Sequence, residues 1–192
     1  MRDTKKNPMM KWFIIHVIVI AVLAAGLFAL IKMPKEEVVN KDTVVYLVRH
    51  AEKITGENAG QDPALTSEGK ARAETLSALL RGEEITKIYS SNYIRTRDTA
   101  APIAAQIGVE IELYDPRDLP ALAAILKENK ERILVVGHSN TIPETVNALG
   151  GVGGTPIFEK SEYDRLYVVT ILADGIVQTD LRRYGVRYVP QD

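Results

Sequence analysis

Two histidines that follow apolar runs are the residues of this chain best suited to chemistry. Residues 44–48 are continuously apolar and lead into Arg49 and His50, while residues 133–136 lead through a glycine into His138. Apolar runs of this length are typical of buried strands. Ligands of open α/β sheets bind in the crevice beyond the carboxyl ends of the strands. We therefore expect both imidazoles and the Arg49 guanidinium to meet at one edge of a sheet.

Two further segments can reach that edge. Residues 91–99 carry Arg95 and Arg97, and the second segment consists of Tyr114 and Asp115. Arginine donates paired hydrogen bonds to phosphate and stays charged at any relevant pH. Histidine can attack phosphorus and carry a covalent phosphoryl group. Two imidazoles, at least two guanidinium groups and one acid therefore suit a site for a tetrahedral oxyanion.

A helix that begins beside His138 is expected to contribute to the same site. Thr141 is predicted to be its N-cap residue, with Glu144 reaching back to the backbone in a capping box. The amide groups at the amino end of such a helix favour an anion next to His138.

Strands and helices alternate through the chain after residue 42, which indicates an α/β fold. The apolar pattern predicts strands at 44–48, 85–90, 133–136, 166–172 and 176–181, and helices at 67–80, 96–107, 119–126 and 142–149. The Asp174-Gly175 step between the last two strands indicates a hairpin. We expect a three-layer αβα sandwich with a mostly parallel central sheet and a C-terminal hairpin.

The N-terminal part is expected to hold the protein at a membrane. Residues 12–31 are almost wholly apolar, and about twenty helical residues span about 30 Å, the thickness of a bilayer core. A cleaved signal, the alternative, has a shorter apolar core. Residues 1–11 are basic, which favours a cytoplasmic N-terminus and an extracytoplasmic body, periplasmic or extracellular. Residues 32–42 are then a tether, and residues 43–192 form one domain.

The composition argues against several classes of protein. The 192 residues carry a formal net charge of −1 and are 46% hydrophobic, so neither a nucleic-acid partner nor a disordered chain is indicated. The chain has no cysteine, which excludes disulfides, thiolate metal sites and a cysteine nucleophile. We predict neither a cofactor nor a metal ion.

Four segments resemble, in order, the motifs of the histidine phosphatase superfamily, which has the phosphoglycerate-mutase-like fold. Residues 49–52 (Arg-His-Ala-Glu) resemble its Arg-His-Gly motif, and residues 65–69 (Leu-Thr-Ser-Glu-Gly) resemble its Leu-Thr-x-x-Gly segment. Residues 91–100 are similar to its Ser-x-x-x-Arg-Ala-x-x-Thr-Ala segment, and residues 137–138 match its second histidine. The resemblance extends over residues 43 to about 173. It indicates branch 1, in the small SixA-like form without a large cap.

The resemblance also implies which residues are catalytic, namely Arg49, His50, Arg95, Asp115 and His138. His50 is implied to be the nucleophile that becomes phosphorylated, and Arg49, Arg95 and His138 complete the phosphate pocket. Asp115 is the first choice as proton donor, and Glu52 is the second. Arg97 lies beside the family arginine in sequence and is expected to face elsewhere.

Two departures from the family pattern bear on this assignment. Ala51 stands where the family usually has a glycine, a small change that is expected to fit. Ser139 follows His138, whereas the acid phosphatase branch has a His-Asp pair. The second departure points to the mutase-like branch.

The implied reaction is a two-step hydrolysis of a phosphomonoester or a phosphohistidine. Neutral His50 attacks phosphorus while Asp115 protonates the departing oxygen, and water then releases phosphate. His50 and His138 are 88 positions apart, which leaves little room for a large cap and predicts an open pocket. We therefore expect a phosphorylated substrate, either a small molecule or a phosphate exposed on a larger molecule.

Three other interpretations remain open at this point. Ser139 resembles the nucleophile of an α/β-hydrolase elbow, but Thr141 stands where a glycine is needed and no histidine follows His138. A zinc site formed by His50, His138 and a carboxylate has no supporting ligand spacing. The non-enzymatic alternative is a membrane-anchored phosphoryl-binding or scaffold protein of the same fold. The intact His50 with both arginines argues against that alternative.

Overall fold

The computed structural model describes residues 42–57 and 59–190 of the chain. The predicted basic segment (1–11), the predicted transmembrane helix (12–31) and the tether up to residue 41 lie outside these residues. Within the two described ranges, no helix is long and apolar enough to cross a membrane.

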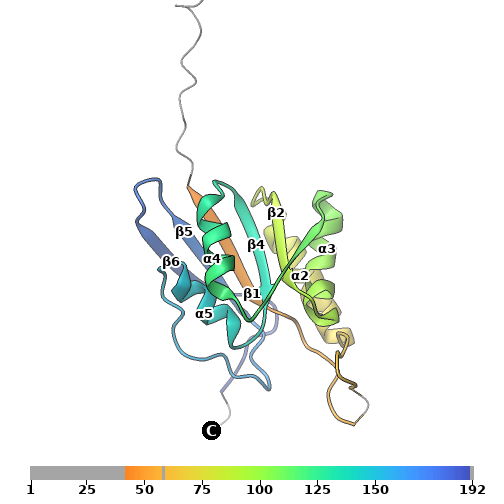
Figure 1. Cartoon of the computed structure of the whole chain (residues 1–192). Coiled ribbons are helices and arrows are strands. Elements are labelled where there is room, and N and C mark those ends of the chain that lie inside the picture. The colour runs from red at the N-terminus through yellow and green to blue at the C-terminus, as the bar shows by residue number, and fades with distance from the viewer. Residues whose placement is uncertain (1–41, 58, 191–192) are drawn as a thin grey trace, which may run out of the picture. The chain divides into compact units, whose positions relative to one another are not determined.

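A six-stranded sheet forms the centre of the domain (Figure 1). Its strands are β1 (Thr43–Arg49), β2 (Lys87–Ser91), β3 (Ile111–Tyr114), β4 (Arg132–Gly137), β5 (Arg165–Ile171) and β6 (Val177–Arg183). They lie in the order β3-β2-β4-β1-β5-β6. The first four are parallel, whereas β5 is antiparallel to β1 and β6 is antiparallel to β5. The predicted mostly parallel sheet with a C-terminal hairpin is confirmed.

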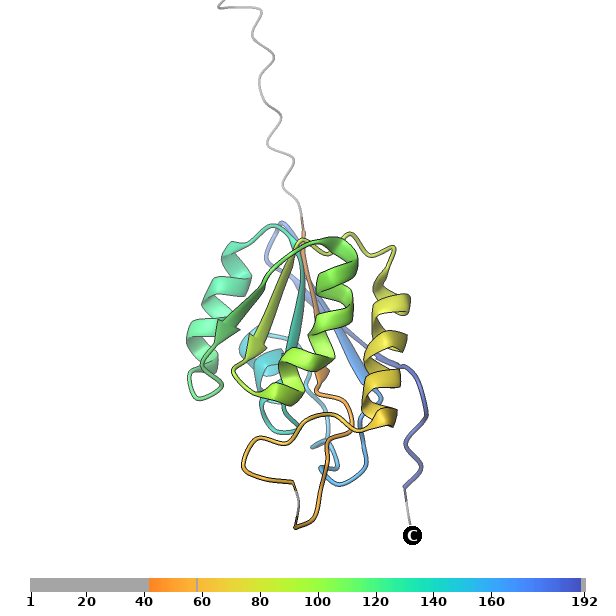
Figure 2. The same ribbon diagram turned by 90° about the vertical axis from the view of Figure 1, so that its right-hand side faces the viewer.

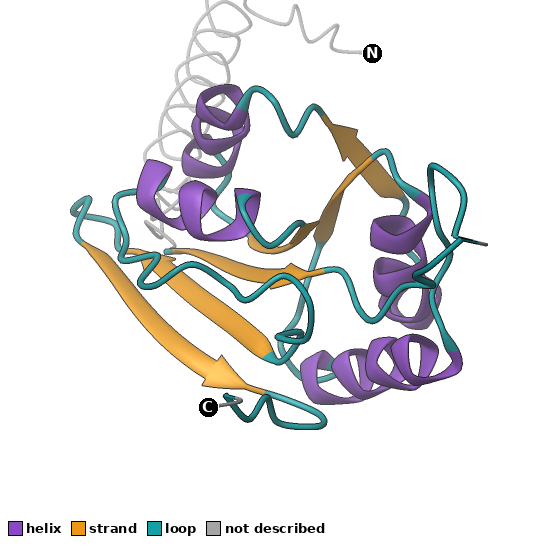
Figure 3. Ribbon diagram, turned by 90° about the horizontal axis from the view of Figure 1, so that it is seen from below, coloured by secondary structure: helices purple, strands orange, loops and turns teal. Residues whose placement is uncertain are grey.

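Helices cover both faces of the sheet, which gives the predicted three layers. In the described part of the chain they are α2 (Ser67–Leu80), α3 (Ile94–Ile107), α4 (Leu119–Glu128) and α5 (Thr141–Ala148). The helices α2 and α3 pack together on one face, and α4 and α5 pack together on the other (Figures 1 and 3).

The central strand β1 contributes side chains to the cores on both faces. Val45 and Leu47 pack in the core beneath α4 and α5, whereas Tyr46 and Val48 pack in the core beneath α2 and α3. Alternate side chains of a strand point to opposite faces of the sheet, so a strand covered on both faces is apolar at every position. This explains the continuous apolar run that precedes Arg49.

One strand was not predicted from the sequence. The strand β3 lies at the edge of the sheet, and Glu112 and Leu113 in it are exposed. A short edge strand buries too few side chains to produce an apolar run or a clear alternation. Its last residue, Tyr114, is buried, and its hydroxyl donates to the Val136 carbonyl oxygen near the end of β4 at 3.4 Å.

The parallel strands place their carboxyl ends at one edge of the sheet. Arg49 at the end of β1 lies opposite Gly137 at the end of β4, and Ser90 in β2 lies opposite Val136. The loop that follows β1 passes beneath this edge and leads to α2, as Figure 2 shows. The segments that carry Arg49, His50 and His138 therefore meet there, as expected.

Candidate active site

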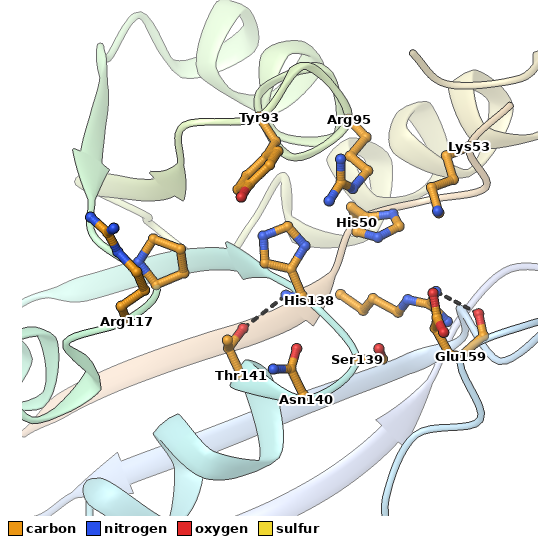
Figure 4. A pocket seen from close by; sticks show the side chains of 12 residues that line it. His50, Lys53, Tyr93, Arg95, Arg117, His138, Ser139, Asn140, Thr141 and Glu159 are labelled. Carbon is orange, nitrogen blue, oxygen red and sulfur yellow. Dashed lines mark hydrogen bonds between the residues drawn. The ribbon is translucent and has the colours of Figure 1, made fainter. Parts of the chain in front are cut away.

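A cavity of about 480 Å³ opens at the carboxyl edge of the sheet (Figure 4). The four residues predicted to form a phosphate pocket all line it, namely Arg49, His50, Arg95 and His138. Arg49 and His50 come from the end of β1, Arg95 from the first turn of α3, and His138 from the end of β4. The two imidazole rings lie 5.6 Å apart, centroid to centroid, and are inclined at 67°.

The backbone after His50 is held in place by contacts that account for two of the sequence motifs. The Ala51 amide donates to the Thr99 hydroxyl at 2.9 Å, which ties the end of β1 to α3. A Cβ on Gly69 would lie 2.1 Å from the Glu52 carbonyl oxygen, so only glycine allows α2 to approach this closely. Thr66 caps the same helix by accepting from the Gly69 amide.

The contacts of His50 define which ring nitrogen can react. Its Nδ1 lies 2.8 Å from the Ala51 carbonyl oxygen, which can only accept a hydrogen bond. Nδ1 therefore carries the hydrogen, and Nε2 keeps its lone pair. Burial lowers the pKa of His50 to about 2, with the charges of Arg49 and Arg95 adding to the effect and the Ala51 carbonyl opposing it. The imidazole is neutral at physiological pH, as a nucleophile must be.

His138 is also neutral, but its contacts differ from those of His50. Its Nε2 lies 2.9 Å from the Ser91 hydroxyl, and its ring meets the Tyr93 ring edge to face at 5.0 Å. Burial lowers the pKa of His138 to about 4, and the charges of Arg95 and Arg49 add to this shift.

The predicted capping box at Thr141 is wrong. The helix α5 begins at Thr141 itself, and Asn140 is the N-cap residue without a side-chain capping bond. The Thr141 hydroxyl instead accepts from the His138 amide at 3.0 Å. The turn that allows this contact leaves no room for a side chain at residue 137. A Cβ on Gly137 would lie 2.9 Å from the Thr141 hydroxyl and 2.6 Å from the Tyr114 hydroxyl. Thr141 therefore fixes the backbone of His138 rather than the helix end.

Arg49 is held by the loop of residues 158–162, which carries no recognisable sequence motif. Its guanidinium donates to three backbone carbonyls, those of Phe158 at 3.4 Å, Glu159 at 2.6 Å and Glu162 at 3.0 Å. It also lies 4.1 Å above the Tyr163 ring. The side chain is 1% exposed, and burial lowers its pKa. Its Nε has no hydrogen-bond partner within the described residues.

Arg95 is positioned by Asp62 and Tyr93. Its Nη1 lies 3.3 Å from Asp62 Oδ1, and its guanidinium lies 4.4 Å from the centre of the Tyr93 ring. The Asp62 carboxylate also accepts from the Ile94 amide at 3.1 Å, so it holds the first turn of α3. The sequence marked Asp62 only as part of an Asp-Pro turn. Arg97, on the same helix, donates to Asn92 and does not line the cavity.

The two carboxylates predicted as proton donors do not lie with these groups. Asp115 forms a bidentate pair with Arg117, with distances of 2.9 and 2.8 Å, and this pair holds the pKa of Asp115 at about 2. Glu52 is bound by Arg72 at 2.7 to 2.9 Å. Neither residue lines the cavity. Both carboxylates are engaged by arginines and lie outside the cavity lining, so this geometry does not support either assignment.

Four charged or aromatic lining residues were missed by the sequence analysis, namely Lys53, Tyr93, Arg117 and Glu159. Figure 4 shows Lys53 and Glu159 on one side of the cavity and Tyr93 on the other, beside Arg117. Lys53 directly follows the motif residue Glu52, and Tyr93 lies within the motif segment 91–100, two residues before Arg95, so these positions were the available signal. Glu159 lies on the loop that binds Arg49, and it is the only carboxylate among the residues that line this cavity. Within the described ranges, no group of three metal-binding side chains is found.

Comparison with known sequences gives a partial match, which includes Arg49, His50 and Arg95 but ends before His138. Residues 45–117 match the sequence profile of the histidine phosphatase superfamily (branch 1). Over 80 residues, 38% of this chain, the sequence is 40% identical to a protein of Photorhabdus laumondii named "Probable phosphoglycerate mutase GpmB". The match spans 35% of the length of that relative.

Several solved structures share the fold. The protein histidine phosphatase SixA, in complex with tungstate, has a TM-score of 0.57 at 20% identity, over 73% of this chain and 95% of that one. A mycobacterial glucosyl-3-phosphoglycerate phosphatase has a TM-score of 0.56 at 13% identity, over 75% and 99% of the two chains. The phosphoserine phosphatase of Entamoeba histolytica has a TM-score of 0.52 at 16% identity, over 74% of this chain and 96% of that one. The profile match over residues 45–117 and the shared fold both support the histidine phosphatase superfamily.

The lowered pKa of His50 predicts that the domain loses stability in mild acid. In the unfolded chain His50 takes up a proton near pH 6.5, whereas in the fold its pKa is about 2. The unfolded state therefore binds more protons below pH 6.5, and stability falls as the pH falls. Between pH 7.5 and 5 we expect His50 to contribute a loss of about 2 kcal/mol.

Urea unfolding of wild type and His50→Gln at both pH values measures this contribution. The carboxylates and His138 titrate in both proteins, so the difference between the two losses isolates His50. Equal losses in the two proteins would show that His50 is not held neutral by the fold.

Proposed function

We propose that this chain is a phosphatase that transfers the phosphoryl group of its substrate first to His50 and then to water. The observation that carries the proposal is the state of His50. Its ring is neutral, its Nε2 is unprotonated, and it lies in a cavity lined by Arg49, Arg95 and His138. A nucleophile surrounded by donors for phosphate oxygens is what phosphoryl transfer needs.

The first step forms a bond between His50 Nε2 and phosphorus and breaks the bond between phosphorus and the leaving group. Arg49 and Arg95 stabilise the negative charge on the phosphoryl oxygens. In the second step a water oxygen attacks phosphorus and the P–N bond breaks. Phosphate leaves, and His50 regains the neutral state that its hydrogen bond to Ala51 favours.

Glu159 replaces Asp115 and Glu52 in this proposal as the group that protonates the leaving oxygen. Among the described residues it is the one carboxylate that lines the cavity, and its own backbone carbonyl accepts from Arg49. It stands on the same side as Lys53 (Figure 4). In the second step the resulting carboxylate takes a proton from the attacking water.

The proposed substrate is a phosphomonoester or a phosphohistidine exposed on a larger molecule. The cavity has a volume of about 480 Å³. In the described part of the chain, the sequence between β1 and β4 contains only the elements of the α/β domain and no inserted domain that would cover the cavity. The proteins of similar fold include a protein histidine phosphatase and a glucosyl-3-phosphoglycerate phosphatase, and this supports a phosphorylated substrate.

We further propose that the N-terminal segment anchors the domain in a membrane, with the domain outside the cytoplasm. The apolar residues 12–31 and the basic residues before them support this orientation. The chain enters the domain at Thr43, the amino end of β1, whereas the cavity lies at the carboxyl end. A strand of seven residues spans about 23 Å, so the start of the domain and the cavity lie at opposite ends of β1.

A reporter enzyme that is active only outside the cytoplasm, fused after Asp192, tests this orientation. We expect reporter activity from the full chain and none from a matched fusion that lacks residues 1–31. A full-length fusion without activity, at normal protein level, would contradict the proposed location.

Two arginines on the same helix provide a matched test of the phosphatase site. Arg95→Gln removes a charged donor from the cavity and should lower kcat/KM for p-nitrophenyl phosphate by about 100-fold or more. Arg97→Gln, two residues further along α3, should stay within about twofold of wild type because its side chain contacts Asn92. Similar values for the two variants would overturn the assignment of the site.

The role of Glu159 predicts a dependence on the leaving group. Glu159→Gln should slow hydrolysis of glycerol 2-phosphate by about 100-fold, because an alkoxide needs a proton to depart. Hydrolysis of p-nitrophenyl phosphate should change by less than about fivefold, because nitrophenolate departs unprotonated. Asp115→Asn is the control and should affect neither substrate. Equal losses on both substrates would remove Glu159 from this role.

A further inference from the structure

Ser91 is a fully buried serine that contacts His138 rather than the substrate cavity. It is the last residue of β2 and is 0% exposed. Its hydroxyl oxygen lies 2.9 Å from His138 Nε2 and 3.2 Å from the Thr96 hydroxyl oxygen. Ser91 does not line the cavity, so it acts on the site only through His138.

The hydrogen atoms of this cluster can be assigned from its acceptors. The Thr96 hydroxyl is 2.7 Å from the Ser91 carbonyl oxygen and 2.9 Å from the Tyr93 carbonyl oxygen. Carbonyl oxygens only accept, so the single hydrogen of Thr96 is directed to the backbone. The Thr96 oxygen can then only accept from Ser91.

The single hydroxyl hydrogen of Ser91 can be donated either to the Thr96 hydroxyl oxygen or to His138 Nε2, and the two distances indicate which bond forms. The separation of 3.2 Å to Thr96 is longer than the usual range for a hydrogen bond between hydroxyls, about 2.5–3.0 Å. The separation of 2.9 Å to His138 Nε2 is ordinary for a bond that involves nitrogen. The Ser91 hydrogen therefore goes to His138 Nε2, which must be unprotonated to accept it.

We propose that Ser91 is a positioning residue that fixes the tautomer of His138, so that His138 presents an Nδ1–H group to the phosphate. In the other neutral tautomer, Nδ1 would present a lone pair to an anionic oxygen, which is repulsive. The neutral state of the ring, which results from its burial, makes the choice of tautomer decisive. The inference rests on the proposed function in so far as the bound anion is the phosphoryl group of a substrate.

The two imidazoles of the site thus present different ring nitrogens to the substrate, one without a hydrogen and one with it. A backbone acceptor, the Ala51 carbonyl, holds the hydrogen of His50 on Nδ1 and leaves Nε2 free to attack. A side-chain donor, the Ser91 hydroxyl, occupies Nε2 of His138 and leaves Nδ1–H free to donate. One ring therefore serves as nucleophile and the other as hydrogen-bond donor, although both are neutral.

The test compares Ser91→Ala with Ser90→Ala in the full-length protein. Ser90 is also fully buried in β2, but its hydroxyl donates to the Ser91 carbonyl and does not contact His138. Nitrogen-15 NMR of labelled histidine reports which ring nitrogen is protonated. The chain has three histidines, so spectra of His138→Gln and His50→Gln identify the relevant signals.

We expect wild type and Ser90→Ala to show His138 protonated at Nδ1, and Ser91→Ala to shift toward the Nε2–H form. The affinity for tungstate, an analogue of phosphate, should fall about tenfold in Ser91→Ala and stay unchanged in Ser90→Ala. A wild-type ring protonated at Nε2, or a Ser91→Ala protein with unchanged tautomer and affinity, would overturn the inference. The shifts are recorded without substrate, so failure of this inference is distinct from failure of the proposed phosphatase activity.

Discussion

The site depends on burying an uncharged imidazole next to two guanidinium groups. His50 and Arg49 are 3% and 1% exposed, and Arg95 lies close enough for its charge to act on both imidazoles. Like charges buried together are unfavourable, and the fold avoids this by keeping both histidines neutral. The Arg49 charge is offset by three carbonyl oxygens and that of Arg95 by Asp62. A phosphate group would bring negative charge to a cavity that is lined by four arginine or lysine side chains and one carboxylate.

Several distant parts of the chain serve the orientation of His50. The ring is fixed by the carbonyl of the next residue, so the backbone at Ala51 must itself be fixed. Thr99 on α3 holds the Ala51 amide, and the close approach at Gly69 packs α2 against Glu52. Glu52 and Arg72 then join the same loop to α2. The sequence motifs are therefore mainly backbone supports for one side chain, and only a few of their residues face the cavity.

Much of the fold and the centre of the site could be predicted from the sequence, because buried parallel strands produce apolar runs and ligands bind where such strands end. This reasoning brought Arg49, His50 and His138 together, and the family resemblance added Arg95. It failed for β3, whose exposed side chains give no pattern. It also missed the carbonyl oxygens of residues 158–162, since a backbone acceptor has no signature in the sequence. The pairing of Asp115 with Arg117 also depends on the local turn and could not be predicted from the sequence.

In the proposed function, His50 carries the phosphoryl group during turnover. The most direct measurement is to mix the protein with a phosphorylated substrate, quench within milliseconds in alkali, where phosphohistidine is stable, and locate the label by tandem mass spectrometry. We expect one phosphoryl group on the peptide that contains His50, attached to the imidazole. A label on any other side chain, or a burst of released phosphate without protein-bound label, would contradict it.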